Sequence, residues 1–211
     1  MSGDIVLYDY WRSSAAYRVR IVLNLKGIAY RAVPIDLAKG EQATADFTAL
    51  NPQGLVPALA IDGHLLTQSL AIIDYLDARV GDPPMVTSDP AARSRVLAQA
   101  LVIAADVHPI NNLRVLNYLR GELGVDEAAV NRWYHHWILE GFAALEGQAP
   151  AQGLFGGERP NLADVCLVPQ LANARRFEVP LDQFPRLVAV DQRLRALPAF
   201  AAAAPEAVRP A

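Results

Sequence analysis

The β-strand signals of this 211-residue chain end near residue 82, and that change in hydrophobic pattern limits the folds it can adopt. Up to residue 82, short β-rich runs alternate with stretches whose apolar residues recur every three or four positions. The segment Gly81-Asp82-Pro83-Pro84 interrupts any helix, because proline has no backbone N–H to donate. Beyond it, helical periodicity dominates. The pattern predicts a small α/β domain over residues 1–82 and an all-helical domain over residues 88–211.

Within the first domain, the predicted order of elements is β-α-β-α-β-β-α. A strand over residues 5–10 is followed by a helix that Ser13 or Ser14 can cap. Asp62-Gly63 suits the tight turn of a β-hairpin. Ser69 is expected to cap the last helix of the domain. These elements predict a small mixed sheet covered by helices.

The second domain is expected to contain only helices. Asn161, followed three residues later by Asp164, resembles a capping box at a helix start. The alanine-rich tail from Ala201, interrupted by prolines, is expected to be weakly structured. The predicted helical segments cover residues 90–120, 127–147, 162–177 and 184–197.

Composition excludes several kinds of partner. The formal net charge of −3 argues against nucleic-acid binding, which requires a clustered basic excess. No apolar run approaches the ~20 residues needed to cross a bilayer. The single cysteine, Cys166, cannot form an internal disulfide, so we expect a cytoplasmic protein. No metal site is expected, because the adjacent His135 and His136 point about 100° apart on a helix.

Three features of the first domain indicate binding of an anionic ligand. Trp11-Arg12-Ser13-Ser14 leads from a strand into a helix N-terminus, where unpaired N–H groups favour an anion. Val56-Pro57 begins a strand, where a cis bond would open the preceding backbone to a ligand. Gln68-Ser69 offers a second helix N-terminus suited to a carboxylate. Each feature alone is weak, but their order within the predicted frame is informative.

The residues of these features resemble a known family. Residues 12–21 are similar to the motif of zeta-class glutathione transferases, S-S-C followed by an aromatic or His residue and R-V-R-I-A-L. Here the first three residues are Ser13-Ser14-Ala15, so the cysteine of the motif is missing. The resemblance implies a thioredoxin-like glutathione-binding domain, a helical domain and a homodimer. The other matching stretches are residues 49–52, 68–73, 108–113 and 162–170.

The resemblance also implies an activity. Zeta-class enzymes use glutathione as a cofactor to isomerise maleylacetoacetate or maleylpyruvate, and nothing in this sequence distinguishes the two small acidic substrates. An alternative is a glutathione transferase that conjugates or dehalogenates small acidic electrophiles such as α-haloacids. A non-catalytic binding module on the same fold is disfavoured by the intact Ser13, Gln68 and Ser69.

The resemblance assigns roles to individual residues. Ser13 is expected to donate its hydroxyl to the sulfur of glutathione, and Arg12 and Arg176 to act with it in catalysis. Arg12, Arg114 and Arg176 are expected to hold the substrate, because guanidinium groups suit carboxylates. For Arg114, a solvated surface charge is an equal alternative. The glutathione-binding positions correspond to Ser13, Ser14, Ala15, Gln42, Val56, Gln68, Ser69, His108, Asn112 and Leu113.

Two of these positions have simpler interpretations. Gln42 can be an ordinary loop amide, and that interpretation is nearly as good. His108 precedes Pro109 in what is expected to be a helix. Its simpler role there is to pack at the kink that the proline causes.

Overall fold

A computed structural model of the chain describes residues 4–210, which form two compact units. The first unit combines residues 4–85 with residues 197–210, and the second is Val86–Ala196. The sequence had assigned all residues from 88 onward to the helical domain. The end of the chain instead groups with the α/β unit, because its last helices pack on a helix of that unit.

The α/β unit has the predicted order of elements, with a four-stranded sheet in the order β2-β1-β3-β4. β1 pairs in parallel with β2 and antiparallel with β3, and β3 and β4 form the hairpin. Asp62 and Gly63 turn that hairpin with φ of 52° and 80°, as a two-residue turn of this kind requires. The elements are β1 (Val6–Asp9), α1 (Ser14–Leu25), β2 (Arg31–Pro34), the 3₁₀ turn η1 (Glu41–Ala43), α2 (Ala45–Leu50), β3 (Ala58–Ile61), β4 (His64–Thr67) and α3 (Ser69–Arg79).

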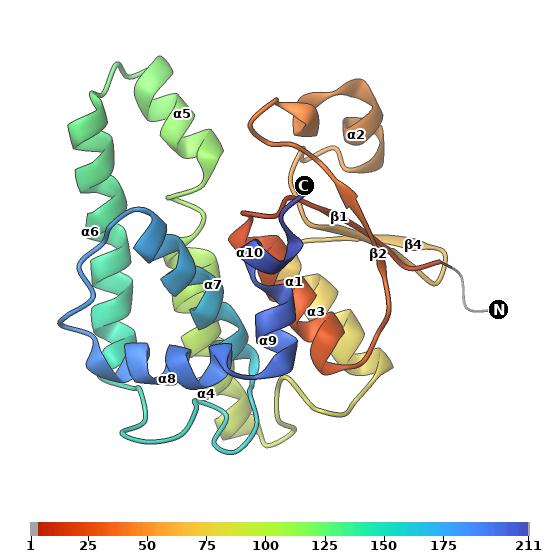
Figure 1. The fold of residues 1–211 in the computed structure, drawn as a ribbon, viewed down its shortest axis with the longest axis vertical. Helices are drawn as coiled ribbons and strands as arrows, with labels where there is room; N and C mark the ends of the chain where they lie inside the picture. The colour runs from red at the N-terminus through yellow and green to blue at the C-terminus, as the bar shows by residue number, and fades with distance from the viewer. Residues whose placement is uncertain (1–3, 211) are drawn as a thin grey trace. The chain divides into compact units, whose positions relative to one another are not determined.

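Helices cover both faces of this sheet because successive side chains of a strand point to opposite sides. Asp9 of β1 reaches the buried Arg20 of α1, and α1 packs beside α3 (Figure 1). Tyr8, on the opposite side of β1, lies against Phe47 of α2, with ring centroids 6.2 Å apart. The loops at the ends of the strands are not part of this packing, so they can carry functional side chains.

The end of the chain is helical, so the expectation of a weakly structured tail was wrong. α9 (Pro198–Ala203) packs along α1, and α10 (Pro205–Val208) follows it (Figure 1). Alanine-rich sequence shows no amphipathic pattern, and here side chains of α1 supply the order by donating to carbonyl oxygens of α9. These bonds run from Tyr17 to Phe200 at 3.4 Å, from Arg20 to Ala203 at 2.9 Å and from Asn24 to Ala199 at 3.0 Å.

The second unit is helical over the segments that the sequence predicts. Its elements are α4 (Pro90–Leu101), the π-helical turn η2 (Val102–Val107), α5 (Leu113–Gly121), α6 (Glu127–Glu146), α7 (Leu162–Arg176) and α8 (Pro185–Arg195). Their core contains fully buried side chains such as Ile138, Phe142 and Leu171.

One helix of this unit is not continuous as expected. The predicted helix over residues 90–120 widens at η2 and then breaks over residues 108–112 before α5 begins. Pro109 cannot donate a hydrogen bond to the preceding turn, which explains why the helix does not continue through it. His108 therefore lies at the edge of a turn and not within a kinked helix.

The capping box at the start of α7 is confirmed, and it does more than cap the helix. The Asn161 side chain accepts from the backbone of α7, and the Asp164 carboxylate accepts from Asn161 N at 3.0 Å. Asp164 is fully buried and also accepts from the N–H groups of Phe155 and Gly156, at 3.0 and 2.9 Å. One carboxylate thus ties the loop before α7 to the helix.

Candidate functional site

The register of the sheet brings the three sequence features of the first unit to one end of it. Tyr8 of β1 lies opposite Ala58 of β3, which lies opposite Thr67 of β4. The loop after β1, the residues before β3 and the residues after β4 therefore lie at the same end of the sheet. These carry respectively Arg12 to Ala15, Val56, and Gln68 with Ser69.

Ser13 is the N-cap of α1, as the sequence predicts. Its backbone is extended, with φ of −69° and ψ of 117°, and its Oγ accepts the N–H of Ala16 at 3.2 Å. The hydroxyl hydrogen is not used in that bond, so it can be donated to a ligand atom at the helix N-terminus. The positive end of the helix dipole at the same place favours a negatively charged atom.

A buried ion pair holds the loop that carries Ser13. Arg20 of α1 donates to both oxygens of Asp9 at 2.7 and 2.8 Å, and to the carbonyl oxygen of Trp11 at 3.2 Å. Burial raises the pKa of Asp9, and the charge and hydrogen bond of Arg20 oppose that rise. The pair fixes both ends of the connection between β1 and α1.

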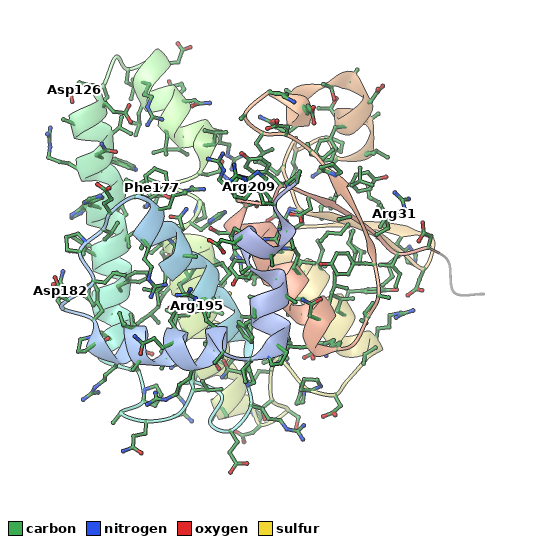
Figure 2. The ribbon with its side chains drawn as sticks, viewed as in Figure 1. Arg31, Asp126, Phe177, Asp182, Arg195 and Arg209 are labelled. Atoms are coloured by element: carbon green, nitrogen blue, oxygen red, sulfur yellow. The ribbon has the colours of Figure 1, made fainter. Side chains whose placement is uncertain are left out.

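Two guanidinium groups lie over the Trp11 ring, next to this helix N-terminus. The exposed Arg12 lies over the indole ring at 4.4 Å, and Arg209, just beyond α10, lies over it at 5.1 Å (Figure 2). Among residues 4–210, neither arginine has a carboxylate within 4.0 Å. Sequence reasoning missed Arg209, because only the packing of α9 on α1 brings it here.

The N-terminus of α3 differs in one respect from the expectation. Gln68, and not Ser69, is the N-cap, with φ of 66° and no capping bond from its side chain. Gln68 Nε2 donates instead to Gln53 Oε1 at 2.9 Å. The first N–H groups of α3 therefore receive no side-chain cap from Gln68, which suits them to bind a carboxylate. The Val56–Pro57 bond nearby is cis.

Gln42, in η1, presents a buried acceptor to this unit. Its Oε1 is buried and has no hydrogen-bond partner in the structure. The backbone at Gly54 lies so close that a Cβ there would stand 3.0 Å from the carbonyl oxygen of Gln42. Buried polar atoms are nearly always paired, so this amide oxygen fits a ligand that brings an N–H group. Glutathione, which has two amides and an amino group, meets that requirement.

The predicted residues of the second unit fall in two places. His108, Asn112, Leu113 and Arg114 lie together between η2 and the first turn of α5. Asn112 is the N-cap of α5, and its Oδ1 accepts from Arg114 N at 3.1 Å. The side chains of Leu113 and Arg114 are exposed, which leaves them accessible to a ligand.

Arg176 lies at the C-terminal end of α7, and its environment differs from that of its neighbour. Arg175 donates to the buried Asp191 at 2.6 Å, so its charge is already paired. Arg176 is exposed, lies 4.8 Å over the ring of Phe177, and has no carboxylate within 4.0 Å in the described part of the chain. Of the two, Arg176 is the one whose charge is left unpaired among the described residues, and its assignment to the substrate remains a prediction.

Within residues 4–210, no three His, Cys, Asp or Glu side chains are grouped so as to hold a metal ion. No helix in that range is both long and apolar enough to span a membrane.

Comparisons with known proteins agree with this fold. The family model for the N-terminal domain of glutathione S-transferases matches residues 3–78, and the model for their C-terminal domain matches residues 128–202. The chain belongs to the glutathione S-transferase family. Its motif at Ser13 and its solved relatives place it in the zeta class of that family.

Three relatives are closely similar over their whole length. The probable maleylacetoacetate isomerase of Vibrio cholerae is 54% identical over 96% of both chains. A bacterial zeta-class maleylpyruvate isomerase, solved in its holo form, has a TM-score of 0.94 at 45% identity, covering 97% of this chain and 98% of its own. A maleylacetoacetate isomerase of Methylobacterium extorquens, solved with malonate and glutathione, has a TM-score of 0.93 at 38% identity, covering 98% of this chain and 100% of its own.

Proposed function

We propose that this protein is a glutathione-dependent cis–trans isomerase that converts a maleyl keto acid to its fumaryl isomer. The observation that carries the proposal is a set of three arginines in a chain 54% identical to a probable maleylacetoacetate isomerase. Arg12, Arg114 and Arg176 are exposed, and among the described residues none has a carboxylate partner. A substrate with two carboxylates requires such cations.

Glutathione, when bound, supplies a thiolate that adds reversibly to the cis double bond and so allows rotation about it. Ser13 serves this chemistry by donating its hydroxyl to the sulfur, and the N-terminus of α1 favours the negative charge. The buried Gln42 Oε1 accepts an N–H of the peptide, and the N-terminus of α3 at Ser69 takes a carboxylate. The proposed reaction does not require the cysteine that the family motif has at the position of Ala15, because the reacting sulfur belongs to glutathione.

The arginines act on the substrate. Guanidinium groups bind carboxylates through two parallel hydrogen bonds and stay charged at all physiological pH values. Arg12 and Arg176 are assigned to binding and to stabilising the negative charge that develops on the substrate, and Arg114 to binding. His108, Asn112 and Leu113, in the segment before Arg114, are assigned to contacts with glutathione.

The assembly and location of the protein are also part of the proposal. We assign it as a homodimer on its membership of the glutathione S-transferase family. We assign it to the cytoplasm because its cofactor must carry a reduced thiol, which reducing compartments maintain.

An ultraviolet assay with maleylpyruvate and with maleylacetoacetate, each with and without glutathione, tests the function. The proposal requires glutathione-dependent turnover that falls by two to three orders of magnitude in Ser13→Ala and Arg176→Ala. Arg132→Ala, which removes an exposed arginine of α6, is the matched control for charge. Asp89→Ala, which removes the N-cap of α4, is the control for a lost helix cap.

The preferred substrate identifies which of the two isomerisations is native. Absence of turnover on both substrates, with glutathione bound, would refute the isomerase. Turnover of α-haloacids by that same protein would then favour the glutathione transferase alternative.

A further inference from the structure

The exposed end of α7, where Arg176 stands, is held by one turn of α6. Tyr134 of that turn is 3% exposed, and its hydroxyl donates to Asn173 Oδ1, one turn before Arg176. Asn173 Oδ1 also accepts from Gln170 Nε2 at 3.4 Å. The amide oxygen is therefore fixed by two donors, and it fixes the direction of the Tyr134 hydroxyl in turn.

The charge of Arg176 also acts on the Tyr134 hydroxyl. Burial raises the pKa of Tyr134 to about 12, while the positive charge of Arg176 and hydrogen bonds with Asn173 and Arg176 oppose the rise. The hydroxyl thus keeps its proton at neutral pH. Its one hydrogen goes to Asn173, so the hydroxyl can only accept from any further partner, and a guanidinium can only donate.

Aromatic rings complete the support for Arg176. The guanidinium lies 4.8 Å over the Phe177 ring, which stacks on the Tyr134 ring with centroids 3.9 Å apart. The Phe177 carbonyl oxygen is bonded to His135 Nε2 at 2.7 Å, so α6 also holds the backbone where α7 ends (Figure 2). The long, flexible Arg176 side chain therefore lies over a ring that stacks on Tyr134 of α6.

The same turn of α6 also holds the segment that precedes Arg114. Asn111 Nδ2 donates to the Tyr134 carbonyl oxygen at 3.2 Å, and Trp133 Nε1 donates to the Ile110 carbonyl oxygen at 3.1 Å. Residues 133–135 therefore connect both places in the second unit where a substrate arginine is expected.

We propose that Tyr134 and Asn173 are positioning residues that orient Arg176 toward a carboxylate of the substrate. The inference rests on the proposed isomerase function and adds two residues to it. Neither residue is expected to touch the substrate or glutathione. Their effect reaches the substrate only through the direction and rigidity of the Arg176 side chain, because an ordered guanidinium loses less freedom on binding.

Tyr134→Phe is the sharpest test, because it removes one oxygen atom and keeps the ring stack on Phe177. Because Arg176 is assigned both to binding and to stabilising the developing charge, Tyr134→Phe should raise KM and lower kcat for the maleyl keto acid, with kcat/KM falling about tenfold. Tyr118→Phe, which removes an exposed hydroxyl of α5, should change neither value. Thermal unfolding of both variants checks that the fold is intact.

A double-mutant cycle with Arg176→Gln separates positioning from a structural effect. If Tyr134 acts through Arg176, then adding Tyr134→Phe to Arg176→Gln raises KM less than twofold further. An equal effect of Tyr134→Phe in both backgrounds would overturn the proposal, as would an unchanged KM in the single variant. The affinity of the glutathione-loaded protein for malonate, measured by calorimetry, should follow the same pattern without relying on turnover.

The outcomes distinguish this inference from the function on which it rests. An unaltered protein without turnover on either maleyl keto acid contradicts the proposed function. An active protein in which Arg176→Gln is harmless contradicts the role of Arg176, and the positioning role falls with it. An active protein impaired by Arg176→Gln but not by Tyr134→Phe contradicts the positioning role alone.

Discussion

Replacing Asp164 with alanine should destabilise the helical unit more than any loss of an ordinary helix cap. The carboxylate is fully buried and is the acceptor for three backbone N–H groups, at 3.0, 2.9 and 3.0 Å. Alanine leaves all three without that partner. A buried donor left unpaired costs about 1–3 kcal/mol.

Three such donors together would cost about 3–9 kcal/mol, and the actual cost should lie toward the lower end of that range. Asn161 N is buried, but the N–H groups of Phe155 and Gly156 are only partly buried and can recruit water. We therefore expect a loss of about 3–5 kcal/mol in the free energy of unfolding of the unit. That is a large part of the stability of a typical domain, about 5–15 kcal/mol.

Urea unfolding followed by circular dichroism measures this loss, with Asp126→Ala as the matched control. Asp126 is the exposed N-cap of α6 and accepts a single bond, from Ala129 N at 2.7 Å (Figure 2). Its removal should cost about 1 kcal/mol. If Asp164→Ala cost no more than this control, the argument from three buried donors would be refuted.

The pH dependence of the protein's stability tests whether burial or hydrogen bonding has the larger effect on the pKa of Asp164. Burial raises the pKa of Asp164 from 3.8 to about 6, although three backbone hydrogen bonds act to lower it. The folded state then holds the proton more tightly than the unfolded state does. The contribution to stability is therefore complete below pH 3.8 and is lost as the pH rises through about 6.

A shift of this size corresponds to about 3 kcal/mol. The stability advantage of the unaltered protein over Asp164→Asn, whose side chain does not titrate, should thus be largest near pH 4 and fall by up to that amount by pH 7. An advantage that grows with pH would show that the three hydrogen bonds outweigh burial.

Two further predictions concern packing and charge in the cores. An alanine at Gly141 of α6 would place its Cβ 2.3 Å from a methyl carbon of Val107, so Gly141→Ala should cost about 1–3 kcal/mol in thermal unfolding. Gly121→Ala meets nothing within 4 Å and should cost nothing, and equal effects of the two would contradict the packing argument. Arg20→Met leaves the buried Asp9 without its partner and should cost about 3–5 kcal/mol in urea unfolding. A loss below about 1 kcal/mol would show that Asp9 takes up a proton in the folded variant at little cost in free energy.

Much of the fold could be predicted because its signals are local. The order of strands and helices follows from the change between two-residue and 3.6-residue hydrophobic periods. The cap at Ser13, the hairpin turn at Asp62-Gly63 and the capping box at Asn161 each depend on a few adjacent residues. The three features of the first unit could be placed at helix and strand ends for the same reason, while their role in binding stays a prediction.

The errors arose where contacts between distant residues decide the structure. The tail from Ala201 is helical because α1 donates side-chain hydrogen bonds to α9 from more than 170 positions away. The helix expected over residues 90–120 breaks after the π-helical turn, which periodicity alone does not reveal. Gln68 replaces Ser69 as the N-cap of α3 through a positive φ that no pattern of residue types indicates.

The sequence by itself determined the family, the two kinds of domain and the serine at the helix N-terminus, because these depend on neighbours along the chain. The resemblance assigned the substrate role to Arg176, but the physical difference between Arg176 and its neighbour Arg175 depends on Asp191 and Tyr134, which lie on other helices. The charge of Arg175 is used inside the protein, whereas Arg176 is held at the surface. Only the tertiary structure supplies the physical reason for that distinction, since it alone decides which groups lie within hydrogen-bond distance.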